Sequence, residues 1–248
     1  ELTRPATVVV LVEPAGPINV GSVARLCANF EVQELRLVRP VCDPLDREAC
    51  RMAVHGLELL RTARRCTSLL EAVADCRRVV ASCGRLDHGS IPLHSPEDAL
   101  RWLLSSGADP SDDQPVAVVF GREDRGLTND ELRLCQRVLT LHSAGSYPSL
   151  NLSHAVAVVL HDLARLQTLP EHDRVPQPDP APPRQLDHCL EDASDLLLEV
   201  GFLLPHTAAA RMNKVRDLLQ RASIQAGEVA LIRGMVRQIR WALTTRRP

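Results

Sequence analysis

Two loops in the middle of the chain combine glycine, serine and charged residues in a way that could hold a ligand. The first follows the apolar run Val116–Phe120 and carries four charged residues between Gly121 and Gly126. The second, residues 142–149, is rich in serine, glycine and proline and ends before Asn151. Small residues let backbone groups approach a ligand closely, and ligands of open α/β sheets bind where strands end. We therefore expect a ligand site here, although an ordinary α/β segment with two turns and no ligand would show the same spacing.

A further candidate is Arg25, which falls on a predicted helix near the N-terminus. The β-branched run Thr7–Val12 predicts a strand, and Asn19 is a good cap for a helix that runs to about Phe30. Arg25 falls on the side opposite the apolar residues of this helix. We expect it on a rigid helix close to the carboxyl end of a strand, where it can face a ligand. A salt bridge on a solvent-facing helix is the alternative.

The segments around these residues alternate between predicted strands and predicted helices. Further short strands are expected over residues 35–38, 78–81 and 138–141. Helices are expected over residues 46–61 and after four capping residues, which are Ser68, Ser95, Thr128 and Asn151. Thr128 and Glu131 also have the spacing of a capping box. This alternation indicates an α/β fold with a mostly parallel sheet and helices on both faces.

Composition divides the chain into three parts. Residues 1–168 carry the α/β pattern. Residues 169–185 predict a linker, because six prolines fall between Pro170 and Pro183. Residues 186–248 predict a small helical extension, which is too short to build much of a core alone. We expect this extension to dock on the body or on a second subunit.

Charge is distributed unevenly between these parts. The whole chain carries a formal charge of −2, but residues 201–248 hold nine basic against two acidic side chains. That segment therefore carries +7 and the rest of the chain −9. Arg233, Arg237 and Arg240 fall on one ridge of the last predicted helix. A basic extension on an acidic body predicts a polyanionic partner, with a merely solvated basic face as the alternative.

Several classes of function find no support in the sequence. The eight cysteines include no CxxC pair and no histidine at metal-ligand spacing, so we expect reduced thiols and no metal. No leader segment and no apolar run of membrane-spanning length is visible, so we expect a cytosolic protein without a membrane partner. The familiar nucleotide, zinc-protease and serine-hydrolase motifs do not occur. Six aromatic residues are too few for a sheet that stacks RNA bases.

Three segments together resemble the signature motifs of the SpoU/TrmH family of ribose 2′-O-methyltransferases, which belongs to the SPOUT class. They are residues 19–25 (NVGSVAR), 118–128 (VVFGREDRGLT) and 149–153 (SLNLS), and their order and separations match as well as their letters. Within the family the chain resembles the TrmJ branch, which modifies position 32 in the anticodon loop of tRNA. This narrower resemblance rests on the extension, at residues 201–203, 211–216 and 231–234.

The resemblance implies a parallel sheet whose C-terminal part is threaded into a trefoil knot. The knotted loops would hold S-adenosylmethionine, mainly through backbone groups. The implied cofactor pocket is formed by Ser82, Cys83, Gly84, Gly121, Leu141, Pro148, Ser149 and Leu150. The first three depart from the Thr-Ser-Ala-like run of relatives but remain small. The resemblance also implies a homodimer in which each site borrows the partner's helix that starts at Asn19.

The implied reaction transfers a methyl group from S-adenosylmethionine to a ribose 2′-hydroxyl of tRNA, with Arg25, Asn19 and Ser149 as catalytic residues. A guanidinium stays protonated and is a poor base. We therefore expect Arg25 to grip the adjacent phosphate and orient the hydroxyl, while Asn19 and Ser149 order the helix start and the pocket.

Other roles are less constrained by the sequence. The expected RNA-binding residues are Arg25, Arg233, Arg237 and Arg240. Glu123 either orients loop backbone near the site or serves structure by pairing with Arg125 or a partner's arginine, and we favour the structural role. Two other functions stay open: methylation of ribosomal RNA with the same pocket, and an RNA-binding subunit that has lost turnover.

Overall fold

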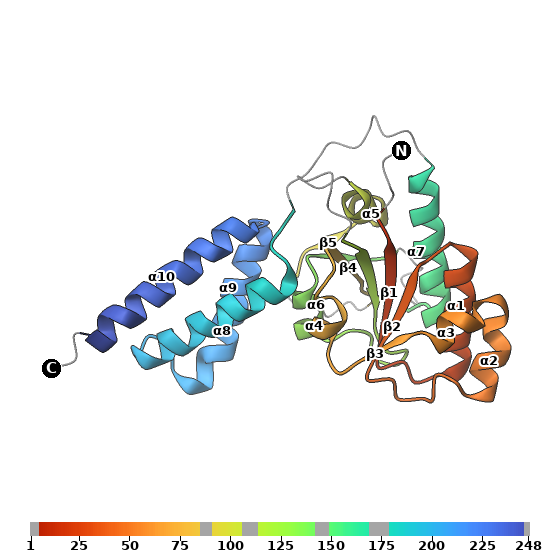
Figure 1. The fold of residues 1–248 in the computed structure, drawn as a ribbon, viewed down its shortest axis with the longest axis horizontal. Helices are drawn as coiled ribbons and strands as arrows, with labels where there is room; N and C mark the ends of the chain where they lie inside the picture. The colour runs from red at the N-terminus through yellow and green to blue at the C-terminus, as the bar shows by residue number, and fades with distance from the viewer. Residues whose placement is uncertain (1–4, 85–90, 106–113, 142–148, 169–178, 246–248) are drawn as a thin grey trace. The chain divides into compact units, whose positions relative to one another are not determined.

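The computed structural model describes residues 5–84, 91–105, 114–141, 149–168 and 179–245. The chain divides into two compact units, Glu1–Gln177 and Pro178–Pro248 (Figure 1). Unit 1 contains the sheet and unit 2 is helical. The first helix of unit 2 starts at Pro183, which is before residue 186, where the sequence predicted the helical extension to begin. Proline suits this position, since the first turn of a helix needs no N–H donor there.

Unit 1 is built on a seven-stranded sheet in the order β3-β2-β1-β6-β4-β7-β5, and every pairing is parallel. The strands are β1 (Thr7–Val12), β2 (Glu34–Val38), β3 (Arg64–Cys66), β4 (Arg78–Ser82), β5 (Leu93–His94), β6 (Val116–Phe120) and β7 (Arg137–Leu139). The predicted parallel α/β fold is confirmed. The sequence missed only β3 and β5, which are short strands at the two edges.

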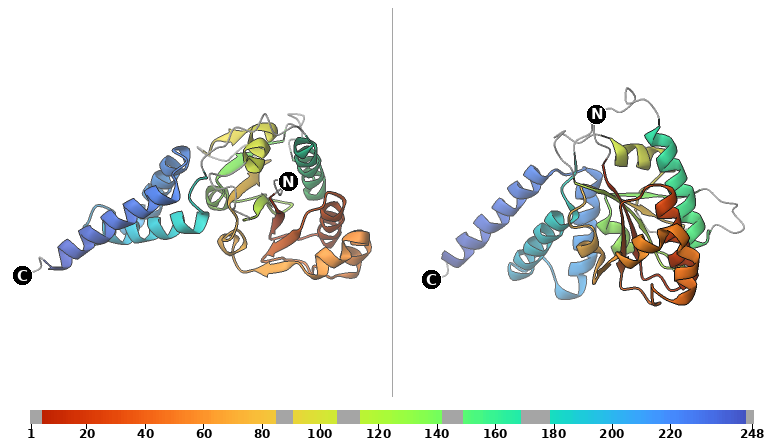
Figure 2. Two further views of the ribbon diagram at one scale, coloured as in Figure 1. Left: turned by 45° about the horizontal axis from the view of Figure 1, so that its top comes forward. Right: turned by 45° about the vertical axis from the view of Figure 1, so that its right-hand side comes forward.

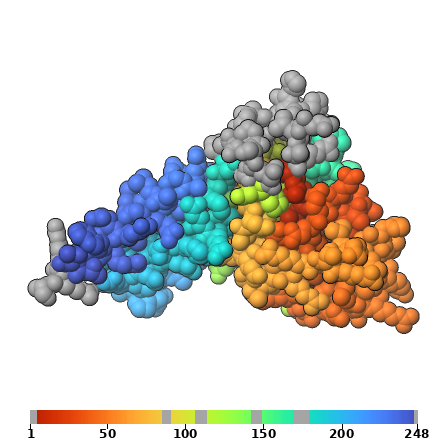
Figure 3. Space-filling model, viewed as in Figure 1, coloured from red at the N-terminus to blue at the C-terminus, as the bar shows by residue number. Residues whose placement is uncertain are grey.

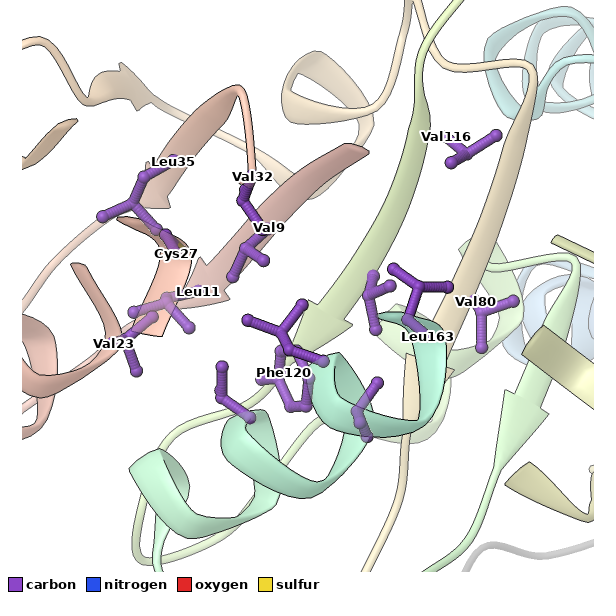
Figure 4. Packing of buried hydrophobic residues seen from close by; sticks show 14 of the residues in the cluster. Val9, Leu11, Val23, Cys27, Val32, Leu35, Val80, Val116, Phe120 and Leu163 are labelled. Carbon is purple, nitrogen blue, oxygen red and sulfur yellow. The ribbon is translucent and has the colours of Figure 1, made fainter. Parts of the chain in front are cut away.

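Helices cover both faces of the sheet, as predicted. Those of unit 1 are α1 (Pro17–Asn29), α2 (Arg47–Ala53), the 3-10 turn η1 (Val54–Gly56), α3 (Leu57–Arg61), α4 (Leu69–Ala72), α5 (Pro96–Leu104), α6 (Asn129–Leu134) and α7 (Leu152–Gln167). Successive side chains of β1 point to opposite faces of the sheet. They therefore pack in two different layers of the core, one on each face. Val9 and Leu11 pack with α1, α5 and α7 (Figure 4), whereas Val8 and Val10 pack with α4 and α6.

Short polar side chains start four of these helices where the sequence predicted caps. Ser68, Ser95, Thr128 and Asn151 each accept a hydrogen bond from a backbone N–H of the first turn. The predicted capping box of Thr128 and Glu131 is present. The predicted cap of α1 is wrong: the helix begins at Pro17 with Gly16 as its cap, so Asn19 lies inside the first turn. Its amide is thereby free to bond to other segments.

Unit 2 consists of α8 (Pro183–Glu199), α9 (Pro205–Arg221) and α10 (Ala226–Thr245). Both α9 and α10 pack on α8 (Figure 2). Their small apolar core includes Leu186, Leu190 and Val229. None of the helices in the described ranges of either unit has the length and apolar character to cross a bilayer. The predicted knot depends on the path of residues 142–148, which lie outside the described residues, and it stays a prediction.

Candidate functional site

A cavity of about 420 Å³ opens at the carboxyl ends of the neighbouring strands β4 and β6. Its walls come from parts of the chain that are far apart in the sequence: residues 82–84, 120–126, Leu141, and the chain around the start of α7. Seven of the eight residues predicted to bind the cofactor line it, namely Ser82, Cys83, Gly84, Gly121, Leu141, Ser149 and Leu150. Pro148 lies outside the described residues. The structure thus brings together what the sequence could only place in separate loops, while the binding role itself stays a prediction.

The loop between Gly121 and Gly126 folds tightly back on itself. The Gly126 N–H donates to the Arg122 carbonyl over 2.8 Å, and Gly126 has a φ of 66°, a conformation that favours glycine. A Cβ atom at Gly121 would lie only 2.2 Å from the Gly126 carbonyl carbon and 2.3 Å from the Leu127 nitrogen. No side chain fits at Gly121 unless the backbone moves. This closeness turns the loop into a compact wall of the cavity.

Glu123 ties this loop to the start of α1. Its carboxylate accepts hydrogen bonds from the backbone N–H groups of Ala15 (2.9 Å) and Gly16 (3.0 Å) and from Asn19 Nδ2 (3.0 Å). Burial by itself would raise the pKa of Glu123, but these donors outweigh it and hold the pKa below its ordinary value. One pairing within the favoured structural role is wrong, because Arg125 pairs with Glu13 and not with Glu123. A pairing of Glu123 with a partner's arginine stays a prediction. Within its own chain, Glu123 orients loop backbone, which is the other role that we considered.

Asn19 extends this connection to the third segment of the site. Its Oδ1 accepts a hydrogen bond of 3.1 Å from Asn151 Nδ2, while Asn151 Oδ1 accepts from the Ser153 N–H and so caps α7. Glu123, Asn19 and Asn151 thus join one residue from each of the three motif segments. The sequence identified Asn151 only as a helix cap. The hydrogen bond from its amide to Asn19 joins residues that are 132 positions apart, so no local sequence pattern could predict it.

Arg25 and Ser149 occupy different surroundings. Ser149 is exposed and lines the cavity. Arg25 is exposed but does not line it, and no hydrogen bond or ion pair joins Arg25 to another described residue. Since α1 starts at Pro17 next to the loop of Glu123, eight residues of helix carry Arg25 about 12 Å further along. Arg25 therefore lies further from the strand end than the sequence suggested, and its role toward a ligand stays a prediction.

The predicted arginine ridge of the extension is divided between two roles. Arg233 Nε and Nη2 lie 3.2 and 3.1 Å from the Asp192 carboxylate, and Arg240 donates to the Asp192 carbonyl over 2.9 Å. These two arginines connect α10 to α8. The periodicity of α10 alone could not predict that α8 is the helix they contact. Arg237 is exposed, and within the described ranges it forms no hydrogen bond or ion pair. The three arginines thus differ in their surroundings, and their binding of RNA stays a prediction.

Comparison with known proteins decides the family. The model of the SpoU rRNA methylase family matches residues 6–161, which include all three motif segments and the cavity. The chain belongs to the SpoU rRNA methylase family. A second family model, the C-terminal domain of the tRNA methyltransferase TrmJ, matches residues 184–248. The predicted family and the predicted enzyme class, an RNA methyltransferase, are confirmed.

Similar proteins cover both units of this SpoU family member. The tRNA (cytidine/uridine-2′-O-)-methyltransferase TrmJ of Pectobacterium atrosepticum is 33% identical over 237 residues, which are 93% of this chain and 95% of that protein. The crystal structure of TrmJ from Z. mobilis ZM4 aligns with a TM-score of 0.78 at 28% identity over 96% of this chain and 100% of that chain. A solved structure that concerns the 2-OH methylation of C/U34 on tRNA aligns with a TM-score of 0.52 at 25% identity. This alignment covers only 65% of this chain and 96% of that chain.

Replacing Glu123 by Gln should destabilise unit 1 and weaken cofactor binding. The neutral amide keeps the shape but loses charge-assisted hydrogen bonds, so we expect the free energy of unfolding to fall by about 2 kcal/mol. Because the pKa of Glu123 is lowered on folding, this stabilisation is complete above the ordinary carboxylate pKa. It decreases below that value and is lost as the pH falls through the lowered pKa of the folded state. Urea unfolding of both proteins at pH 7 and pH 4 measures the difference, which should shrink at the lower pH.

Asp124→Asn provides the matched control for Glu123→Gln. Asp124 lies in the same loop, but its carboxylate is exposed and pairs with Arg122. An exposed ion pair adds little to stability, so we expect this variant to unfold like the unaltered protein. Equal unfolding curves for Glu123→Gln and Asp124→Asn would contradict the role of Glu123.

Proposed function

We propose that this protein transfers a methyl group from S-adenosylmethionine to the ribose 2′-hydroxyl of a cytidine or uridine at position 32 of tRNA. The observation that supports this most is the cavity in which residues 82–84, the loop at Gly121 and the chain at Ser149 meet. These are the segments that the family resemblance assigns to the cofactor. Their backbone groups and small side chains suit a ligand that is held mainly by main-chain contacts. Cytoplasmic tRNA is the partner, and no metal takes part.

The methyl group of S-adenosylmethionine is already activated, so the protein acts mainly by alignment. Arg25 grips the phosphate next to the target nucleotide and orients the 2′-hydroxyl, whose proton leaves as the oxygen attacks. Ser149 shapes the cavity, and Asn19 fixes the start of α1. Because Arg25 is exposed and lies outside the cavity of its own chain, it serves the site of a second copy. The working enzyme is therefore a homodimer.

The choice of tRNA over ribosomal RNA rests on unit 2. The TrmJ C-terminal model matches this unit, and the curated TrmJ proteins match the chain along nearly its whole length. The likeness to the C/U34 system stops at 65% of this chain, which favours position 32 over position 34. Asn19, Arg25 and Ser149, which the family resemblance assigns to catalysis, are all present, and this argues against a subunit without turnover.

Mass spectrometry of tRNA tests this function. Purified protein, S-adenosylmethionine and unmodified tRNA transcripts should give one ribose methyl group at position 32, and a transcript with a 2′-deoxyribose at that position should give none. Ribosomal RNA fragments serve as the comparison substrate. Methylation at position 34, or of ribosomal RNA alone, would replace the proposed substrate, and no methyl transfer to any RNA would contradict the proposal.

Arg237→Ala should weaken tRNA binding about fivefold without changing the stability of unit 2, because Arg237 is exposed and forms no bond to a described residue. Arg233→Ala should instead lower the unfolding temperature, because Asp192 loses its partner. Filter binding of labelled tRNA and thermal unfolding measure the two effects. If Arg237→Ala binds tRNA normally, the extension makes its phosphate contacts elsewhere.

A further inference from the structure

We propose that two arginines on α2, Arg47 and Arg51, bind RNA phosphates beside Arg25. The inference rests on the proposed function and extends it, since it assigns an RNA-binding surface to unit 1 itself. Neither residue belongs to the motif segments or to the cavity. The proposed surface lies on α2, which packs beside α1 (Figure 1).

Close backbone packing places α2 directly against the helix that carries Arg25. A Cβ atom at Gly21 would lie 2.1 Å from the Ala49 carbonyl oxygen, and one at Gly56 would lie 2.1 Å from the Ala24 carbonyl oxygen. Two such contacts, one at each end, fix α2 and η1 along α1. Ala49 and Ala53 form the buried side of α2, so Arg47 and Arg51 lie on its opposite, solvent-facing side.

The side chains of Arg47 and Arg51 have no electrostatic partner in the part of the chain that the structure describes. They lie four positions apart, so they share one side of α2, and both are exposed. Arg47 opens the helix, where the helix dipole disfavours a cation. Helix stability therefore does not explain it. The nearby Asp46 is engaged as the cap of α2, and Glu48 is the one acidic residue within the helix.

Two partly exposed arginines on other helices of unit 1 are arranged differently. Arg101 lies 2.8 Å from Glu97, and Arg133 lies 3.4 Å from Asp130, each with an acid on its own helix. Arg25, Arg47 and Arg51 are exposed and have no such acidic partner among the residues that the structure describes. Part of the segment 47–61, orange in Figure 3, is exposed at the surface of unit 1. RNA is a polyanion whose charges repeat along the chain. The RNA that flanks the methylated nucleotide can therefore pair with several of these arginines.

The double variant Arg47→Gln/Arg51→Gln tests the surface. We expect tRNA to bind about tenfold more weakly at 0.1 M salt, and the slope of log K against log salt to fall by about 2, since each phosphate contact contributes nearly one unit. Affinity for S-adenosylmethionine, the unfolding temperature and the rate at saturating tRNA should not change. Arg47→Lys/Arg51→Lys should keep most of the tRNA affinity, because a phosphate needs a positive charge here and no particular fork.

Arg101→Gln/Arg133→Gln is the matched control and should bind tRNA like the unaltered protein. If Arg47→Gln/Arg51→Gln also keeps its affinity and salt slope while the unaltered protein methylates tRNA, the surface inference is wrong and the proposed function stands. If the unaltered protein neither binds nor methylates tRNA, the proposed function is wrong and the inference fails with it. A fall in unfolding temperature equal in the Gln and Lys variants would show a structural role instead.

Discussion

Arg25→Lys should lower the rate of ribose methylation at least 100-fold and leave the affinity for S-adenosylmethionine unchanged. Lysine keeps the positive charge but lacks the planar fork that can hold a phosphate by two hydrogen bonds. A misplaced phosphate leaves the 2′-hydroxyl out of line with the methyl group, and such errors of alignment reduce rates by about this factor. Arg25 does not line the cavity of its own chain, so the substitution should leave the affinity for the cofactor unchanged. Single-turnover methylation and calorimetry measure the two quantities.

Mixed dimers separate the proposed sharing of Arg25 from an effect within one chain. A dimer of one Arg25→Lys subunit and one Gly121→Ala subunit should retain one working site if Arg25 acts on the partner's cofactor, and none if it acts on its own. Arg101→Lys, on a partly exposed arginine paired with Glu97, should be fully active. Full turnover by Arg25→Lys itself would contradict the assigned role.

Gly121→Ala should abolish measurable cofactor binding and reduce the free energy of unfolding by about 2 to 3 kcal/mol. The added methyl group would meet the backbone of Gly126 and Leu127 at 2.2 and 2.3 Å. Backbone cannot turn away as a side chain can, so the loop must open, and inserting a carbon into such packing carries a penalty of this size. Opening the loop also moves Glu123 away from α1. Calorimetry with S-adenosylmethionine and urea unfolding measure both effects.

Gly234→Ala is the control for this substitution. A Cβ atom at Gly234 meets nothing within 4 Å, and the residue lies inside α10, where alanine is preferred over glycine by about 1 kcal/mol. We expect that variant to be slightly more stable and to bind the cofactor normally. Normal cofactor binding by Gly121→Ala would mean that the loop is not a wall of the cofactor site.

Local signals in the sequence predicted most of the framework. The β-branched run of β6, the capping box of Thr128 and Glu131, and the cap Asn151 each involve residues within a few positions of one another, so they can be identified without knowing the fold. The edge strand β3 was missed because Arg64 and Arg65 are exposed there and leave only three residues without an apolar pattern. Sheet edges have one paired side and need less apolar character.

The connections within the site could not be predicted in the same way. Glu123 reaches Asn19 across 104 positions, and Arg233 reaches Asp192 across 41. Both contacts exist because the fold brings helix starts or helix faces together, and periodicity carries no information about that. Asn19 is an example. By its type it could cap a helix, but α1 starts earlier, at Pro17, and the Asn19 amide forms hydrogen bonds with Glu123 and Asn151 instead.

The Glu123 carboxylate belongs both to the wall of the cavity and to the anchor of α1. Any displacement of that wall by a bound small molecule is therefore transmitted to the helix on which Arg25 lies. Thermodynamic reciprocity then sets a condition on the two ligands. By whatever factor a filled cavity alters the affinity for the nucleic acid, the nucleic acid must alter the affinity for the small molecule by the same factor.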